Sequence, residues 1–190
     1  MPNPEKSEAE ILQDKVRQTI SEIRDVLLTH LPDFFEAEIK RRFVAAGEFA
    51  DRLTDERLTE LKTEVKAQSQ KFATEIAAFL NDESRWWVAP PTEGDKKHLG
   101  DNEAIWNAVK GVETRVVAFL QRFGFPLLPG ETEYTVRYRL PAMFIHGKYL
   151  PGLCETYWNR LHQWFATKQQ KDQQSAEAKR QVRAERWEKT

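Results

Sequence analysis

A formal net charge of -1 over 190 residues gives the chain no overall field that would attract nucleic acid or an anionic membrane, so such partners must meet a local patch. A hydrophobic content of 40%, with 6 Trp and 11 Phe, excludes a wholly disordered chain. Cys154 is the only cysteine, which excludes an internal disulfide, and neither a signal peptide nor a membrane-spanning stretch of about 18 apolar residues is apparent, so we expect a cytoplasmic protein.

The N-terminal part of the sequence predicts two helices. Ser7 and Glu10 have the spacing of a capping box, which satisfies free N–H groups at the start of a helix. Apolar side chains then recur every three or four residues over residues 7–30. Pro32 is expected to end this helix, because proline lacks the N–H that a helix interior needs. A short second helix follows and ends at Gly47.

Residues 54–81 predict the longest helix of this half. Their apolar side chains form a seam close to a heptad repeat, and at 1.5 Å per residue the helix would be about 40 Å long. Together with the preceding helices it gives an N-terminal helical hairpin or bundle over residues 1–81. Because few helices of this half cover the seam, we expect it to be buried by the C-terminal unit or by a second copy of the chain in a homodimer.

Residues 82–100 interrupt the helical spacing with prolines and glycines, and they predict a linker or long loop at a domain boundary. The start of this segment is more apolar than a free linker would be. Trp86 and Trp87 are therefore expected to dock on a neighbouring surface, and both are candidate interaction residues.

The C-terminal half combines helices with a turn-rich middle. Asp101 is expected to cap a helix that ends at Gly124. Tyrosine, valine and arginine side chains later alternate with the period of a half-exposed strand, so residues 134–150 predict a small β-hairpin. Pro151 is well placed to begin the last helix, whose apolar face ends near Ala166.

The predicted fold class is mainly α, a helical bundle with a long N-terminal helical hairpin and a small β-hairpin in the C-terminal half. Residues 101–168 make up the C-terminal helical unit that contains the small hairpin. Residues 169–190 are rich in glutamine and charge and have few apolar side chains, which predicts either a solvated helix or a frayed tail.

The sequence contains no phosphate-binding loop, nucleophile elbow or zinc-protease motif, and we expect neither a cofactor nor a metal. Glu155, Asn159 and His162 share one helix face, but asparagine is a poor metal ligand and no second Glu-x-x-His pair occurs. Cys154 lies on an apolar stripe, which favours packing over reactivity. Enzyme function is therefore unsupported, although catalytic residues scattered along the chain would leave no such motif.

Basic side chains gather around the predicted small hairpin. Between residues 134 and 171 a single acid, Glu155, stands against six basic residues, which are Arg137, Arg139, Lys148, Arg160, Lys168 and Lys171. Basic and tyrosine side chains together could hold phosphates and stack on bases, so one hypothesis is nucleic-acid binding through the hairpin at 134–149. The alternative is that Arg137 and Arg139 form the solvated face of a strand.

The leading hypothesis is a non-enzymatic protein–protein interaction or scaffold function, because aromatic anchors and charged helices are present without a catalytic motif. The helical surfaces and the corner at 134–151 would make the contacts. A second alternative is a small-molecule or enzymatic site in the C-terminal unit around Tyr138, His146, Lys148 and Tyr149. The candidate interaction residues are Trp86, Trp87, Arg137, Arg139, His146, Lys148 and Tyr149.

Overall fold

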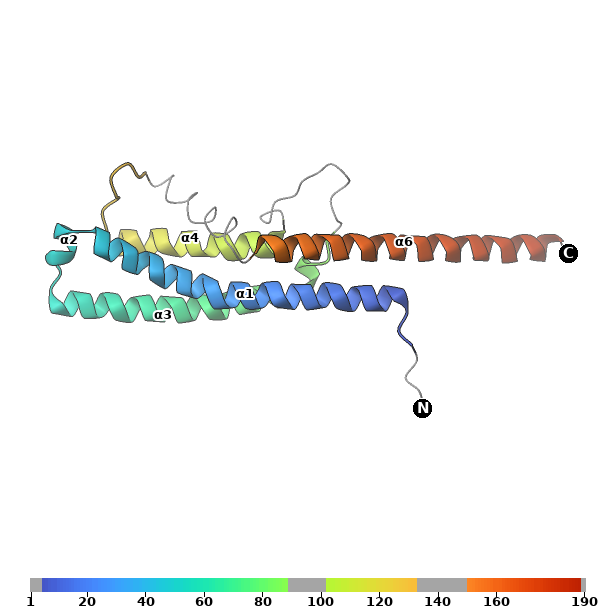
Figure 1. Cartoon of the computed structure of the whole chain (residues 1–190), viewed down its shortest axis with the longest axis horizontal. Coiled ribbons are helices and arrows are strands. Elements are labelled where there is room, and N and C mark those ends of the chain that lie inside the picture. The colour runs from blue at the N-terminus through green and yellow to red at the C-terminus, as the bar shows by residue number, and fades with distance from the viewer. Residues whose placement is uncertain (1–4, 89–101, 133–149, 189–190) are drawn as a thin grey trace.

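A computed structural model of the chain describes residues 5–88, 102–132 and 150–188 (Figure 1). All regular secondary structure in these ranges is helical, which confirms the mainly α class. In chain order the elements are α1 Glu8–Ala45, α2 Glu48–Asp51, α3 Asp55–Leu80, the 3-10 helix η1 Glu83–Arg85, α4 Glu103–Phe123 and α6 Pro151–Glu188.

Helix α1 is continuous, so the prediction that Pro32 separates two helices is wrong. A proline inside a helix removes one backbone hydrogen bond and commonly bends the axis. Figure 1 shows α1 changing direction between its two halves. The helix continues because its apolar side chains remain buried, at most 2% exposed, on both sides of the proline. We call these side chains the α1 stripe, which consists of Val16, Ile20, Ile23, Leu27, Leu31, Phe35 and Ile39.

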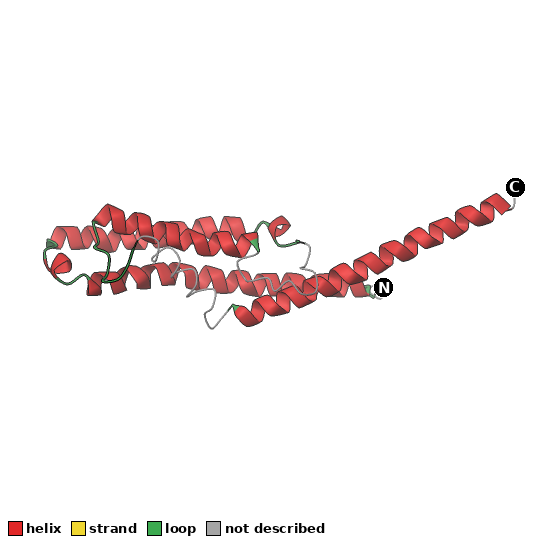
Figure 2. Ribbon diagram, turned by 90° about the horizontal axis from the view of Figure 1, so that it is seen from above, coloured by secondary structure: helices red, strands yellow, loops and turns green. Residues whose placement is uncertain are grey.

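The other three long helices all pack against α1 (Figures 1 and 2). Helix α3 runs antiparallel to α1, while α4 covers its C-terminal half and α6 its N-terminal half. Phe119 of α4 meets Phe35 of α1 edge-on, with ring centroids 5.9 Å apart. Arg160 of α6 instead reaches Thr19, near the start of α1. Helix α1 is therefore the common support of the fold.

The buried side chains of the four long helices form one continuous cluster. The segments 1–81 and 101–168 thus share a core, and α1 and α4 cover the seam of α3. The seam therefore packs on α4 of the C-terminal unit, one of the two partners that the sequence left open, and also on α1 of its own half. Homodimerisation stays a prediction.

The helix ends show how closely local signals set the boundaries. Thr54 caps α3 by accepting a hydrogen bond from the Arg57 N–H, as expected for a helix beginning near residue 54. The cap of α4 is Asn102 rather than the predicted Asp101. Its side-chain oxygen accepts hydrogen bonds from the N–H groups of Ala104, at 2.9 Å, and Ile105, at 3.2 Å. Gly124 ends α4 in the left-handed conformation with φ of 69°, which glycine adopts without strain.

The predicted small β-hairpin is corrected, because no strand or sheet occurs in the described ranges. Leu150, the last residue of the predicted hairpin, is buried, and its carbonyl accepts a hydrogen bond from the Cys154 N–H at 3.0 Å. It therefore belongs to the start of a helix, where Pro151 fits because the first helical residue needs no N–H partner. Residues 134–149 of the predicted hairpin lie outside the described residues.

The sequence predicted either a solvated helix or a frayed tail for residues 169–190. Helix α6 continues to Glu188, so the described part of this segment is a helix. None of the described helices is long and apolar enough to cross a lipid bilayer.

The central position of α1 predicts unequal effects of two truncations on this one helix. Leu31→Ala removes a completely buried side chain and should lower the free energy of unfolding by about 2–5 kcal/mol. Val44→Ala, at a position 75% exposed, should change it by about 0.5 kcal/mol or less. Urea unfolding followed by circular dichroism measures both, and equal losses would contradict the assignment of the core to the α1 stripe.

Candidate interaction surface

Helix α6 is fixed to the body of the protein by a buried polar contact at its start. The hydroxyl of Tyr157 donates a hydrogen bond to the Trp86 carbonyl and accepts one from the Asn102 amide at 3.3 Å. Tyr157 is fully buried, and burial is the main cause that raises its pKa. The Trp86 indole N–H donates to the Leu80 carbonyl at 2.9 Å. The end of α3, the start of α4 and the start of α6 are therefore held together with their polar groups paired.

An aromatic cluster holds the next part of α6. Trp87 packs against Trp164 with ring centroids 4.9 Å apart, and Phe165 follows at 4.7 Å from Trp164. Arg17 of α1 lies over the Trp87 ring, and Lys168 lies over the Trp164 ring. All three aromatic side chains are half-buried, so this cluster is the outer edge of the core.

Polar contacts also join α6 to α1. Arg160 donates hydrogen bonds to the hydroxyl of the buried Thr19 at 2.7 Å and to the Lys15 carbonyl at 3.2 Å. Near the start of α1, hydrogen bonds from Ser7 hold the pKa of Glu10 below its ordinary value, with a smaller contribution from the charge of Lys171. Every side chain from residue 168 to residue 186 is exposed, so α6 leaves the body within this stretch.

Beyond Lys171, α6 projects away from the body (Figure 2). Residues 172–186 are all exposed, and at 1.5 Å per residue the part up to residue 188 is about 25 Å long. We call residues 172–188 the α6 projection. Over residues 172–186 it presents its entire circumference to solvent.

Charged side chains of both signs lie around the α6 projection, and three of the basic ones share a face. Lys179, Arg183 and Arg186 follow one another at spacings of four and three, which places them on one stripe of the helix. We call these three residues the basic stripe. Glu177 and Glu185 fall about 100° or more away from it at 100° per residue.

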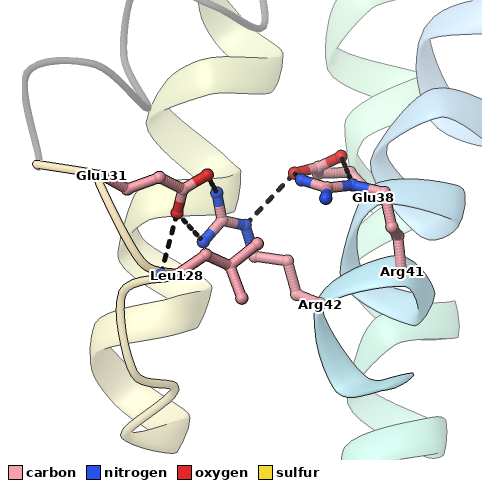
Figure 3. A network of polar contacts seen from close by, with 5 residues as sticks. All are labelled: Glu38, Arg41, Arg42, Leu128 and Glu131. Carbon is pink, nitrogen blue, oxygen red and sulfur yellow. Dashed lines mark hydrogen bonds and ion pairs between the residues drawn. The ribbon is translucent and has the colours of Figure 1, made fainter. Parts of the chain in front are cut away.

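A network of buried charges lies at the opposite end of the body (Figure 3). Arg42 is 1% exposed and makes a two-pronged contact with Glu131, with N–O distances of 2.7 and 2.8 Å. Its Nε also donates to Glu38, which Arg41 contacts in the same two-pronged manner. Glu131 further accepts a hydrogen bond from the Leu128 N–H at 3.1 Å. The network ties the segment after α4 to α1 and leaves each charge paired.

A groove of about 720 Å³ runs between α3 and α4. Its floor includes Phe72 and Phe119, which are already packed in the core. Two ion pairs cross its rim, where Arg122 contacts Glu64 at 2.7 Å and Arg115 contacts Glu75. These pairs join α3 to α4, and Lys110 also lines the groove.

Two of the residues predicted as interaction candidates are described by the structure. Trp86 is completely buried, whereas Trp87 is half-buried, so of the two only Trp87 has surface to offer a partner. The other candidates lie outside the described residues, and their roles stay predictions; they are Arg137, Arg139, His146, Lys148 and Tyr149, together with Tyr138 of the proposed small-molecule site.

The structure draws attention to the basic stripe, which the sequence interpretation passed over. Its spacing is visible in the sequence, but spacing places residues on one face only where the segment is helical, and residues 169–190 could equally have formed a frayed tail. The helical state of residues 172–188 is what makes the spacing meaningful.

Comparisons of the chain with models of protein families, with curated proteins and with solved structures gave no match. In the described part of the chain, no group of three or more His, Cys, Asp and Glu side chains is placed to hold a metal ion.

The buried charge network predicts a large effect from a single substitution. Arg42→Met would leave Glu38 and Glu131 without their buried cation, so the free energy of unfolding should fall by about 3–5 kcal/mol. The matched control is Arg52→Met, which breaks an ion pair with Glu48 whose side chains are 80% and 89% exposed. It should cost about 0.5 kcal/mol or less. Urea unfolding compares the two, and a small loss for Arg42→Met would show that the network does not hold the fold.

Cys154 should be inert in the folded chain. It is 3% exposed, and burial raises its pKa from 9.0 to about 12, so little thiolate is present near neutral pH. Alkylation at pH 8 should therefore be slow until the chain unfolds, whereas Ser175→Cys on the α6 projection should react at the rate of a free thiol. The unfolded chain loses this proton first, so the thiol's contribution to stability should decline between pH 9.0 and about 12. Equal alkylation rates for the two thiols would contradict this placement of Cys154.

Proposed function

We propose that the chain is a non-enzymatic interaction protein that uses the α6 projection as its binding element. One observation carries the proposal. Residues 172–186 continue α6 away from the body with every side chain exposed, while the first part of the same helix is anchored in the core. A rigid body that holds out a helix presents its side chains in a fixed register to a partner.

The energetics of an unsupported helix favour the same conclusion. Helical segments shorter than about 12–15 residues are marginal in water without tertiary packing, because most helix stability in proteins comes from a buried face. The α6 projection begins from an anchored turn, which avoids the nucleation step, but it gains no packing of its own. A partner that contacts the projection would supply the stabilisation that the body does not.

The classes of partner that the sequence left open are another protein, a second copy of the chain and a nucleic acid. The corner at 134–151 stays a predicted contact, because residues 134–149 lie outside the described residues. A cytoplasmic site of action accords with the buried free thiol of Cys154, since reducing compartments keep such groups reduced.

The proposal predicts that the projection is dispensable for folding and required for binding. The chain shortened to residues 1–171 should unfold within about 0.5 kcal/mol of the full chain, because it keeps all the core contacts. Paired capture from an extract of the source cell, with the full and the shortened chain as baits, should retain a partner only with the full chain.

Hydrogen exchange supplies the second readout. In the purified chain, amides of residues 172–186 should exchange much faster than those of the α1 stripe, and the captured partner should slow them. A partner that both baits retain equally, or that leaves these amides unprotected, would show that the projection is not the binding element.

A further inference from the structure

We propose that the α6 projection of one chain binds the groove between α3 and α4 of a second copy of the chain. This inference rests on the proposed function and names the partner. The groove is lined by residues between Glu64 and Phe79 of α3 and between Asn107 and Arg122 of α4. Figure 2 shows the projection pointing away from its own body, so the groove that it reaches belongs to another copy.

The groove and the projection agree in length. Residues 64–79 and 107–122 form the two walls, and at 1.5 Å per residue each wall is about 22 Å long. The part of the projection with exposed side chains, residues 172–186, is also about 22 Å long. A docked projection would therefore occupy the groove from end to end.

One face of the projection is free of long side chains. Ser175, Ala178 and Val182 follow one another at spacings of three and four, which places them on one line of the helix, and all three are exposed. We call these three residues the small face. At 100° per residue, positions 180 and 187 fall about 160° and 140° away from Val182. A helix with small side chains at the contact can approach a neighbouring helix closely.

The floor of the groove suits such a face. It is built from buried aromatic rings, among them Phe72 and Phe119, with the half-buried Phe79 beside them. Gly111 carries no side chain, and an added Cβ there would lie 2.9 Å from the Phe72 ring, so this ring packs directly against the α4 backbone. The small face would bury apolar surface on this floor without displacing a core side chain.

The two sides of the small face carry opposite charges. Lys179 and Arg183 of the basic stripe fall about 60° and 100° from Val182 on one side, and Glu185 falls about 60° from it on the other. Asp172 shares the basic side but lies about 10 Å before Lys179. A helix that lies in a groove on its small face would therefore present bases to one wall and an acid to the other.

The walls of the groove carry the complementary charges. The lining residues of α3 include two acids and no base, and those of α4 include three bases and no acid; they are Glu64 and Glu75 on α3, and Lys110, Arg115 and Arg122 on α4. Turning a docked helix end for end exchanges its two sides. One of the two directions therefore places Lys179 and Arg183 along the acidic wall and Glu185 along the basic wall.

The ion pairs across the rim are compatible with this contact. The side chains of Glu75 and Arg122 are 50% and 58% exposed, so the pairs that they make with Arg115 and Glu64 retain solvent-facing surface. Exposed ion pairs of this kind contribute about 0–1 kcal/mol each. A docked projection would extend them into a network of alternating charge. Its length, small face and charges all match the groove of the same chain, which selects a second copy as the partner.

The test measures the weight-average mass of the full chain by sedimentation equilibrium from about 10 µM to about 1 mM. The contact is at the small end of protein interfaces, so we expect the mass to rise towards that of a dimer within this range. Ala178→Glu/Val182→Glu places two carboxylates on the small face and should weaken association about tenfold or more. The matched control, Ala176→Glu/Ala184→Glu, makes the same charge change at exposed positions more than 100° away from Val182 and should associate within about threefold of the unchanged chain.

A second pair of variants tests the groove. Ala118→Trp places a large side chain at an exposed position of the lining and should also weaken association about tenfold or more. Ala67→Trp, at an exposed position of α3 outside the lining, is its control and should associate like the unchanged chain. Circular dichroism and urea unfolding check that all four variants keep the fold.

Mixing the two weakened variants distinguishes this contact from any other mode of self-association. Ala178→Glu/Val182→Glu keeps an intact groove, and Ala118→Trp keeps an intact projection. Neither should associate alone, but together they should form a one-to-one complex. A pairing of two projections with each other predicts instead that Ala118→Trp associates as well as the unchanged chain, and that result would overturn the proposal.

Two further outcomes would overturn it. One is a monomeric mass of the full chain at every concentration up to about 1 mM, and the other is a mixture of the two weakened variants that forms no complex. Neither removes the proposed function, because the paired capture with the chain shortened to residues 1–171 tests the projection against partners of any class.

Discussion

Burial of the α1 stripe is the constraint on which the rest of the fold depends. From Val16 to Ile39 its side chains are at most 2% exposed, and they are covered along their length by three different helices. Because α4 uses one half of α1 and α6 the other, the two halves face different partners. A proline between them is tolerated, since the bend that it introduces separates two packing surfaces rather than interrupting one. Burial of apolar surface against this one helix therefore holds the other three long helices in place.

Buried polar groups give this apolar core a defined register. Arg42, Asn102 and Tyr157 are each at most 1% exposed, and each joins elements that are distant in the sequence. Burying such groups carries a desolvation penalty that their hydrogen bonds only offset. They discriminate strongly between arrangements, because a helix shifted by one turn would leave a charge or hydroxyl buried without its partner. The apolar cluster stabilises the bundle, and these contacts select one packing of it.

The sequence predicts elements whose signals are local. Helix α3 lies within the predicted 54–81 because Thr54 and the apolar seam suffice to define it, and Gly124 ends α4 for the same reason. The prediction of a helix end at Pro32 was wrong, because the apolar side chains on both sides of the proline are buried and keep the helix continuous. The Arg42–Glu131 contact joins residues 89 positions apart, which no spacing reveals. The basic stripe could be predicted only in part. Its spacing is visible in the sequence, but its exposure depends on where the packing of α6 against α1 ends.

The α6 projection arises where two changes along α6 coincide, the end of its apolar pattern and the end of its packing on the body. In the sequence, the apolar pattern of α6 ends near Ala166; in the structure, the side chains of α6 are all exposed from residue 168 to residue 186. The helix therefore loses its apolar face and its support at nearly the same place. Glutamine, alanine, lysine and arginine, all good helix formers, still extend it.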